Sequence, residues 1–474
     1  MSQTKIVATV GPACNTHEHL TNLVKAGVNV FRLNFSHGTH ESHLSVIELI
    51  RQINRELDTH VAILGDLQGP KLRVGEIEGG AIELQPNDTI TFTHIPKLGT
   101  REELYVSYHN LHADVEVGQT ILVDDGKIEL RVIAIDHENE RVTLLAPYGG
   151  RIASKKGINL PNTKISLPCL TEKDLKDLDF IIEHHLDWVA LSFVRKPSDI
   201  IELKNIIEKQ NSFIKVIAKI EKPEALEYLR EIILEADGVM VARGDLGVEL
   251  PVEKIPLIQR TIIKKCIHRA KPVIMATQMM ESMMENTKPS RADITDVSNA
   301  VWEGADAVML SGETANGKHP VLVVETMKKI IDEVEKEEGV YNRNLIPQKH
   351  SPTFLSDALC YNAAKIADDV EANAIIAHTR SGYTGFMISS FRPHCPIYLF
   401  TDRPSFVNQS SLCWGVQQSY YFPNLNAIDD MIAYSIEILK NNKKIKEGDT
   451  VVNTGAMPTH AQGPTNMLKI STVK

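Results

Sequence analysis

Short apolar runs rich in β-branched residues alternate with amphipathic stretches along most of the chain. Eight such runs have the length of strands and lie at residues 4–10, 29–35, 61–67, 187–193, 215–221, 238–244, 272–277 and 307–312. The segments that separate and follow them, such as 17–27, 41–54 and 171–186, carry apolar residues at helical spacing. Eight strand and helix pairs predict an α/β fold of the (β/α)8 TIM barrel type rather than an open sheet.

The region between the third and fourth of these strands has a different pattern. Residues 68–165 show period-2 alternation that is repeatedly broken by Gly, Pro, Asn and Asp. This pattern predicts a small, barrel-like all-β domain inserted into the barrel. Because loops that follow barrel strands emerge at the active-site end, we expect the insert to act as a lid.

A second α/β rhythm begins after a polar, proline-containing linker at 339–353. Strands are expected at 373–379, 396–401 and 449–455, with helices at 357–370 and 427–442. This segment predicts a separate C-terminal α/β domain with a regulatory role. The expected domains are 1–67 and 166–345 for the catalytic barrel, 68–165 for the inserted lid and 346–474 for the C-terminal domain.

Composition narrows the class of protein. The 474 residues include 61 acidic and 51 basic side chains, and the formal charge of -10 has the wrong sign for a nucleic-acid binder. Six widely spaced cysteines indicate a reducing, cytoplasmic compartment rather than a disulfide framework. We expect no membrane partner, because no apolar run approaches the roughly 20 residues of a span and the N-terminus lacks a signal core.

Polar residues follow seven consecutive strands of the predicted barrel, at the ends where such barrels place their chemistry. They are Arg32, Asn34, Ser36, His37, Asp66, Ser192, Arg195, Lys219, Glu221, Arg243, Gly244, Asp245, Thr277, Gln278, Ser311 and Glu313. Any one of them has an ordinary structural explanation as a helix cap or an ion pair. Polar groups at seven strand ends in succession are harder to explain without a site.

Two carboxylates in this set suit a divalent cation. Glu221 and Asp245 end adjacent strands, so their hard oxygens are expected on one Mg²⁺ or Mn²⁺. Arg32, Lys219 and Arg243 add positive charge around it. Such a set favours an anion with dispersed charge, as in phosphoryl transfer.

The segment ARGDLGVELP places a glycine at the sixth strand end and begins a short helix. Its free N–H groups are suited to receive a carboxylate. The sequence contains no Walker A or kinase-type glycine loop, so nucleotide binding has to come from other residues.

Longer motifs now connect these residues. The chain reads TKIVATVGPA, NVFRLNFSHGTH, KKGINLP, LSFVRKPSD, IAKIEKPEA, VMVARGDLGVEL, MATQMMESM and VMLSGETANGKHP in that order. This series resembles the pyruvate kinase family from Thr4 to about Pro320, and the C-terminal domain is similar in layout. The resemblance implies phosphoryl transfer from phosphoenolpyruvate to ADP, giving ATP and an enolate that is protonated to pyruvate, in the final step of glycolysis.

The resemblance also implies roles for individual residues. Lys219 would stabilise the transferring phosphoryl group and the enolate, and Arg32 would grip the phosphoryl group. Glu221 and Asp245 would hold Mg²⁺ or Mn²⁺. The Gly244 and Asp245 amides would hold the substrate carboxylate together with Thr277.

Other implied roles concern the nucleotide and the proton. Asn34, Arg73 and Lys156 would meet ADP and its phosphates. Thr277 and Ser311 are candidates for the proton relay to the enolate, and the alternative is that both are strand-end hydroxyls bonded to backbone.

The run after the third strand departs from the common family pattern. Many members carry an acid where this chain has Lys71, and they need potassium at residues equivalent to Asn34, Ser36, Asp66 and the carbonyl of Leu67. A fixed ammonium at Lys71 would replace the ion electrostatically, so we expect K⁺ not to be strictly required. A retained ion site is the alternative, because the ligand residues persist.

Two loops have both a structural and a functional explanation. The 124–126 segment, Asp-Asp-Gly, is typical of a hairpin turn, and the resemblance also allows contact with nucleotide or its metal. Thr379, Arg380, Ser381, Gly382, Tyr383 and Thr384 form either an N-capped helix start or an effector loop for a sugar phosphate. The last loop offers His460 but no Arg or Lys, which favours a monophosphate over fructose 1,6-bisphosphate. The resemblance implies a homotetramer.

Two other functions remain open at this point. A magnesium-dependent lyase or aldolase acting on an oxoacid would account for Glu221 and Asp245 but not for Arg73, the KKG motif or the insert. A non-catalytic, metabolite-sensing paralogue would be expected to have lost Lys219, Glu221 or Asp245, and all three are present.

Overall fold

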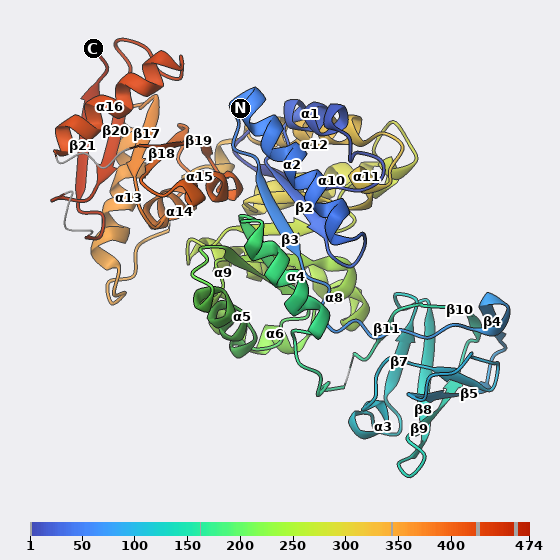
Figure 1. The fold of residues 1–474 in the computed structure, drawn as a ribbon. Coiled ribbons are helices and arrows are strands. Elements are labelled where there is room, and N and C mark those ends of the chain that lie inside the picture. Colours follow the sequence, from blue (N-terminus) through green and yellow to red (C-terminus); the bar gives the residue numbers. More distant parts are fainter. Residues whose placement is uncertain (1, 162, 343–344, 423–426, 459–462) are drawn as a thin grey trace.

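Eight parallel strands close into a barrel in the computed structural model, which describes residues 2–161, 163–342, 345–422, 427–458 and 463–474 (Figure 1). The strands follow the order β1-β16-β15-β14-β13-β12-β3-β2 around the barrel. Their bounds are β1 (Lys5–Thr9), β2 (Val30–Asn34), β3 (Ala62–Asp66), β12 (Trp188–Leu191), β13 (Lys215–Ile220), β14 (Gly238–Ala242), β15 (Val273–Ala276) and β16 (Ala307–Leu310). All eight predicted strands and the TIM barrel are confirmed.

Helices surround the barrel and alternate with its strands. The main ones are α1 (His17–Ala26), α2 (His40–Leu57), α4 (Glu172–Glu183), α5 (Pro197–Lys209), α6 (Glu224–Glu227), α7 (Leu229–Glu235), α9 (Ile255–Ile267), α10 (Arg291–Glu303) and α12 (Pro320–Val334). Capping boxes at Thr39, Thr171 and Ser290 satisfy the first free N–H groups of α2, α4 and α10. Two short helices, α8 (Arg243–Glu249) and α11 (Gly312–Ala315), begin directly at strand ends.

The inserted domain is all-β, as the alternation predicts. A six-stranded sheet runs in the order β11-β7-β8-β9-β5-β6 beside a two-stranded sheet of β10 and β4. The elements are β4 (Ala81–Leu84), β5 (Asp88–Thr93), β6 (Glu103–Tyr105), α3 (Leu111–Asp114), β7 (Thr120–Val123), β8 (Ile128–Asp136), β9 (Arg141–Ala146), β10 (Gly150–Ala153) and β11 (Ile158–Asn159). It has its own apolar core and projects away from the barrel (Figure 1).

The C-terminal domain has a five-stranded sheet in the order β19-β18-β17-β20-β21. Its elements are α13 (Phe354–Asp369), β17 (Ala374–His378), α14 (Tyr383–Ser390), β18 (Ile397–Thr401), α15 (Pro404–Gln409), β19 (Val416–Tyr421), α16 (Ile428–Asn441), β20 (Thr450–Gly455) and β21 (Met467–Thr472). The three expected strands are present. The two edge strands β19 and β21 were not predicted, because their polar side chains weaken the apolar pattern that marks a buried strand.

The C-terminal domain packs against the end of the barrel opposite the insert (Figure 1). Arg392, which follows α14, is buried and pairs with Asp306 at 3.0 Å from its Nη1 atom. The Trp188 indole donates to the Gln409 carbonyl at 3.1 Å, and Lys5 Nζ donates to the Val416 carbonyl at 2.6 Å. In the described part of the chain, no helix is both long and apolar enough to cross a membrane.

Candidate active site

Lys219 is the centre of a buried charge cluster at the carboxyl ends of the barrel strands. Its Nζ atom lies 2.8 Å from Glu221 Oε1 and 3.3 Å from Asp66 Oδ1, and it donates to Ser192 Oγ at 2.8 Å. The side chain is only 12% exposed. Burial alone would lower the pKa of this ammonium, but the Asp66 and Glu221 carboxylates outweigh burial and raise the pKa above its ordinary value. Lys219 is therefore a fixed positive charge.

Asp66 holds a second cation beside the first. Arg32 Nε lies 2.6 Å from Asp66 Oδ2, and Arg32 Nη1 donates to the Thr9 hydroxyl at 3.0 Å. Burial would raise the pKa of Asp66, yet Lys219 and Arg32 together bring it below the usual range. The structure thus brings together Arg32, Asp66 and Lys219 at the ends of β2, β3 and β13, with β12 between the last two strands.

The two candidate metal ligands occupy adjacent strand ends. Glu221 is buried, and its Oε2 atom accepts the Phe193 N–H at 2.9 Å. Burial raises the pKa of Glu221, the Lys219 ammonium opposes that shift, and the Asp245 carboxylate adds to it. Asp245 lies in the first turn of α8 and is half-buried. The Glu221 and Asp245 carboxylates repel each other, and a divalent cation bound by both would remove that repulsion.

The remaining strand-end residues form a polar rim. The Gly244 N–H donates to Thr277 Oγ1 at 2.9 Å, and that hydroxyl donates to the Ala276 carbonyl at 2.6 Å. Thr277 has a φ of +65°, an uncommon backbone conformation for a β-branched residue. Ser311 follows β16, and its N–H donates to Glu313 Oε2 at 2.7 Å. The side-chain hydroxyl of Thr277 is thus bonded to backbone, as one of the two hypotheses has it.

Arg243, the third cation that the sequence places around the metal, is ion-paired in the structure. Its Nη1 atom pairs with Asp296 at 2.5 Å, and its Nη2 atom donates to the Thr277 carbonyl at 2.6 Å. Arg195 is similarly engaged, since it donates to the carbonyls of Ile165 and Leu167 in the segment that returns from the insert. Both arginines hold the backbone around the site in place.

The predicted nucleotide residues of the insert, Arg73 and Lys156, contact other residues of the insert. Arg73 Nη1 donates to the Lys155 carbonyl at 2.9 Å, and Lys156 Nζ pairs with Asp124 Oδ1 at 2.8 Å. Asp124 begins the turn between β7 and β8, where Asp124 and Asp125 have positive φ values of 54° and 56°. The predicted hairpin turn is present, and it carries the carboxylate that holds Lys156.

Three of the four proposed potassium ligands, Asn34, Asp66 and Leu67, have polar contacts within the protein, although Asp66 Oδ1 has no hydrogen-bond partner among the described residues. Asn34 Oδ1 accepts the Ser36 N–H at 3.1 Å, and the Leu67 carbonyl accepts the Ser192 hydroxyl at 2.7 Å. Both Asp66 oxygens face cations. The Lys71 side chain lies beside Gly157 in the insert, and within the described ranges it has no ion-pair partner.

Sequence reasoning missed two residues that position the cluster. Thr9 ends the first strand, and its hydroxyl orients Arg32. It was missed because the predicted strand-end residues cover only the second to the eighth strand. Ser192 was in that set without a role, and it bridges Lys219 to the Leu67 carbonyl. The signal that could have found Thr9 is its position, because it is a polar residue at the carboxyl end of a predicted barrel strand.

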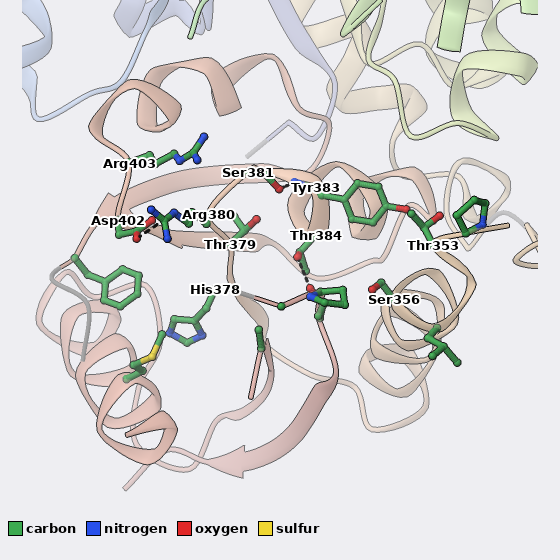
Figure 2. Close-up of a pocket in the computed structure, with 18 residues that line it drawn as sticks. Thr353, Ser356, His378, Thr379, Arg380, Ser381, Tyr383, Thr384, Asp402 and Arg403 are labelled. Carbon is green, nitrogen blue, oxygen red and sulfur yellow. Dashed lines mark hydrogen bonds and ion pairs between the residues drawn. The ribbon is translucent and has the colours of Figure 1, made fainter. Parts of the chain in front are cut away.

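The C-terminal loop borders a cavity of about 580 Å³ (Figure 2). The Gly382 N–H donates to the Thr379 hydroxyl at 3.0 Å, and Tyr383 N–H donates to Ser381 Oγ at 3.4 Å. Thr384 Oγ1 contacts Thr465 Oγ1 at 2.5 Å. These contacts build the loop into the start of α14.

Two arginines face this cavity on the same side, as Figure 2 shows. Arg380 Nε lies 3.7 Å from Asp402 Oδ2, and Arg403 is the neighbour of that aspartate. Arg403 is a second cation that the sequence did not suggest, because it follows β18 rather than the expected loop. His460 lies outside the described residues.

Comparisons with known proteins identify the family of this chain. The pyruvate kinase barrel domain matches residues 1–324, and the pyruvate kinase alpha/beta domain matches residues 357–471. Pyruvate kinases of Geobacillus stearothermophilus and Staphylococcus aureus are each 42% identical over 474 aligned residues. These alignments cover 99% and 100% of this chain and 80% and 81% of the respective relative.

A solved structure agrees as well. The crystal structure of a pyruvate kinase from Cryptosporidium parvum superposes with a TM-score of 0.92 at 35% identity, covering 100% of this chain and 96% of that one. None of these matches favours a lyase, an aldolase or a non-catalytic sensor. The chain belongs to the pyruvate kinase family and is a phosphotransferase that acts on phosphoenolpyruvate and ADP.

Proposed function

We propose that the barrel mouth carries out this phosphoryl transfer with Lys219 and Arg32 as its fixed cations. The observation that carries the proposal is the burial of Lys219 between Asp66 and Glu221, which holds its ammonium in one place. Preorganised charges stabilise the dispersed negative charge of a phosphoryl group in transit without a reorganisation cost. Lys219 would also stabilise the enolate that remains.

Glu221 and Asp245 would hold Mg²⁺ or Mn²⁺ in the reacting enzyme. The donor set fits, because two carboxylates from adjacent strand ends supply hard oxygens and Glu221 is kept in place by the Phe193 N–H. When bound, the ion would polarise phosphoryl and carboxyl oxygens. Lys219 beside Glu221 limits the negative charge of this pair when the substrate is absent.

The substrate carboxylate would bind the amides of Gly244 and Asp245 at the start of α8, next to the Thr277 hydroxyl. The support is the contact that orients Thr277 toward the Gly244 amide. Thr277 and Ser311 both stand at the rim and remain our candidates for moving a proton to the enolate. The support is that each follows the carboxyl end of a barrel strand, Thr277 after β15 and Ser311 after β16.

Asn34, Arg73 and Lys156 would bind ADP, with the insert closing as a lid over the mouth. The insert already touches α8, since Asn159 Nδ2 donates to Glu249 Oε1 at 3.0 Å. Lys156 would have to exchange Asp124 for a phosphate, which is feasible because the lysine side chain is 41% exposed. Closure would exclude water that competes with ADP for the phosphoryl group.

We further propose that K⁺ is not strictly required. The support is that Arg32 and Lys219 already neutralise Asp66, that the Leu67 carbonyl accepts the Ser192 hydroxyl, and that Lys71 follows β3 with an ammonium beside Gly157. Wild-type activity should persist in buffer free of potassium and sodium. Loss of activity in that buffer with recovery on adding K⁺ would instead show a functional ion site at Asn34, Ser36, Asp66 and Leu67.

The C-terminal cavity would bind a sugar monophosphate as an effector through residues 379–384 and Arg380. The support is a polar loop at the start of α14 with an arginine that is 46% exposed. We also propose a homotetramer, as the family layout implies, and a cytoplasmic site of action. The six cysteines are buried and unpaired, which suits a reducing compartment.

A coupled assay of pyruvate formation from phosphoenolpyruvate, ADP and Mg²⁺ tests the proposed chemistry. We expect Lys219→Met to lower kcat by about 10³-fold, the scale of losing one preorganised charge contact at a reacting group. The control is Lys204→Met. Lys204 lies on the outer helix α5 and pairs with Asp237. Full activity of Lys219→Met would overturn the role assigned to this residue.

A further inference from the structure

All four histidines of the insert gather at one end of that domain. They are His94, His109, His112 and His137, among 18 histidines in the whole chain. The β8–β9 hairpin, which marks this end, points away from the barrel (Figure 1). The cluster is therefore distinct from the phosphoryl-transfer site.

The fold brings three segments of the insert together here. β5 pairs antiparallel with β9, and Thr93 is opposite Arg141. The next step of that register places His94 opposite Glu140. His109 precedes α3, which packs against β9, so the pairing of strands and not their local sequence assembles the cluster.

The side chains converge on the Glu140 carboxylate. His94 Nε2 lies 3.0 Å from Glu140 Oε2, and His112 Nε2 lies 4.0 Å from Glu140 Oε1. The rings of His94 and His109 are edge to face with centroids 4.2 Å apart. One donor atom from each of His94, His109 and Glu140 lies within 4.8 Å of the others.

These separations suit a small tetrahedral ion. Two ligands at about 2.0 Å from Zn²⁺ lie roughly 3.3 Å apart at the tetrahedral angle, close to the distance between His94 and Glu140. His109 is exposed and has no side-chain hydrogen bond in the described part of the chain, so its ring can rotate inward. The Nδ1 atoms of His94 and His112 are buried and have no hydrogen-bond partner among the residues that the structure describes. The Nε2 atom of each ring faces Glu140.

The donor set distinguishes this ion from the one in the barrel. Imidazole nitrogens with one carboxylate favour ions of borderline softness such as Zn²⁺, whereas Mg²⁺ prefers oxygen ligands alone. We infer that His94, His109 and Glu140, with His112 beside them, form a binding site for a divalent transition ion of the zinc type. A bound ion would join the end of β5, the start of α3 and the β8–β9 turn.

Zinc titration of the full-length, chelator-treated protein in excess Mg²⁺ tests this inference. The Mg²⁺ keeps the barrel carboxylates occupied, and the variant His109→Ala is compared with wild type by calorimetry. We expect wild type to bind one more equivalent of Zn²⁺ than His109→Ala, or to bind that equivalent at least about tenfold more tightly. The matched control is His268→Ala, an exposed histidine at the end of α9, which should behave as wild type.

Two further measurements guard against a folding artefact. Glu140→Gln keeps the size of the side chain and should lose the same equivalent. Co²⁺ added to wild type should give the intense visible absorption of a tetrahedral site, and His109→Ala should not. Equal zinc binding by wild type, His109→Ala and Glu140→Gln would overturn the site, and so would equal loss in His268→Ala.

Discussion

The barrel mouth and the C-terminal cavity are both proposed anion sites lined by arginine or lysine, but they hold these cations in different ways. Lys219 and Arg32 are 12% and 11% exposed and contact carboxylates at 2.6 to 3.3 Å. Arg380 is 46% exposed and reaches Asp402 only at 3.7 Å. The first pair is fixed before any ligand arrives, whereas Arg380 is available to change partners.

This difference fits the functions that we propose for the two sites. A reacting phosphoryl group is stabilised most by charges that do not move, and buried ion pairs fix them at the cost of desolvation. A loop that responds to a ligand needs a cation whose existing contact is weak enough to exchange. Substitutions that remove ion-pair partners at the barrel mouth, or that change the arginines of the C-terminal loop, therefore test this comparison directly.

The largest effect should come from Glu221→Gln. The substitution removes a proposed metal ligand and leaves Lys219 with Asp66 as its single carboxylate partner in the described part of the chain. We expect kcat to fall by about 10³-fold or more and the Mg²⁺ concentration for half-maximal activity to rise. Steady-state kinetics across a Mg²⁺ series measures both.

Glu253→Gln is the control for that experiment, because Glu253 is an exposed carboxyl in the turn after α8. It should retain wild-type kinetics. A Glu221→Gln enzyme with unchanged Mg²⁺ dependence would show that the metal is held elsewhere.

The next largest effect is on the pH dependence of stability. His378 lines the C-terminal cavity and is buried against Ser435 and the Thr454 carbonyl. Burial lowers the pKa of His378 from 6.5 to about 4. The unfolded chain therefore binds more protons between these pH values, so stability falls as pH drops from about 6.5 toward 4. The loss amounts to about 3 kcal/mol over that range.

Urea unfolding at several pH values, followed through the C-terminal domain, measures this loss. His378→Gln should flatten the pH dependence by about that amount while the barrel signal is unchanged. The same slope in both proteins would assign the pH sensitivity to other groups.

Lys71→Glu should make the enzyme's activity depend on K⁺. We expect the variant to lose at least about tenfold in kcat without K⁺, because a negative charge replaces an ammonium near the phosphoryl site, and to regain activity when K⁺ is added. Lys71→Met separates loss of the positive charge from gain of a negative one. Potassium-independent activity of Lys71→Glu would remove Lys71 from the explanation.

The smallest effect should come from Arg380→Gln. If the loop binds a sugar monophosphate, the variant should need about tenfold more of it for half-maximal activation, with basal kcat unchanged. Assays with glucose 6-phosphate and ribose 5-phosphate as probes measure the shift. Arg403→Gln is the matched comparison, and a larger shift in that variant would make Arg403 the principal anchor.

The catalytic cluster was predictable because a parallel barrel brings all its strand ends to one face. Apolar runs identified the eight strands, and topology then joined Arg32, Lys219 and Glu221 although 189 positions separate the first from the last. The engagement of Arg243 with Asp296 was not predictable, since no spacing rule links a strand end to the middle of α10. The exposure of a cation depends on tertiary neighbours, which the sequence pattern does not encode.

The insert illustrates the same limit. Its alternation predicted strands and the turn at Asp124, which are local features. The gathering of His94 and Glu140 depends on the antiparallel register of β5 and β9, which β6, α3, β7 and β8 separate along the chain. Edge strands β19 and β21 were missed for a related reason, because they carry polar residues where a buried strand would be apolar.

Helix α14 connects the C-terminal cavity to the barrel. Its N-cap is Gly382 in the proposed effector loop, and it ends just before Arg392, whose guanidinium is buried on Asp306 and the Gly304 carbonyl. Asp306 also accepts the N–H of Val273, so one carboxylate joins the helix to the amino ends of β15 and β16. Breaking a buried ion pair costs about 3–5 kcal/mol. Helix α14 therefore links the proposed effector loop to the amino ends of β15 and β16, the two strands that precede Thr277 and Ser311.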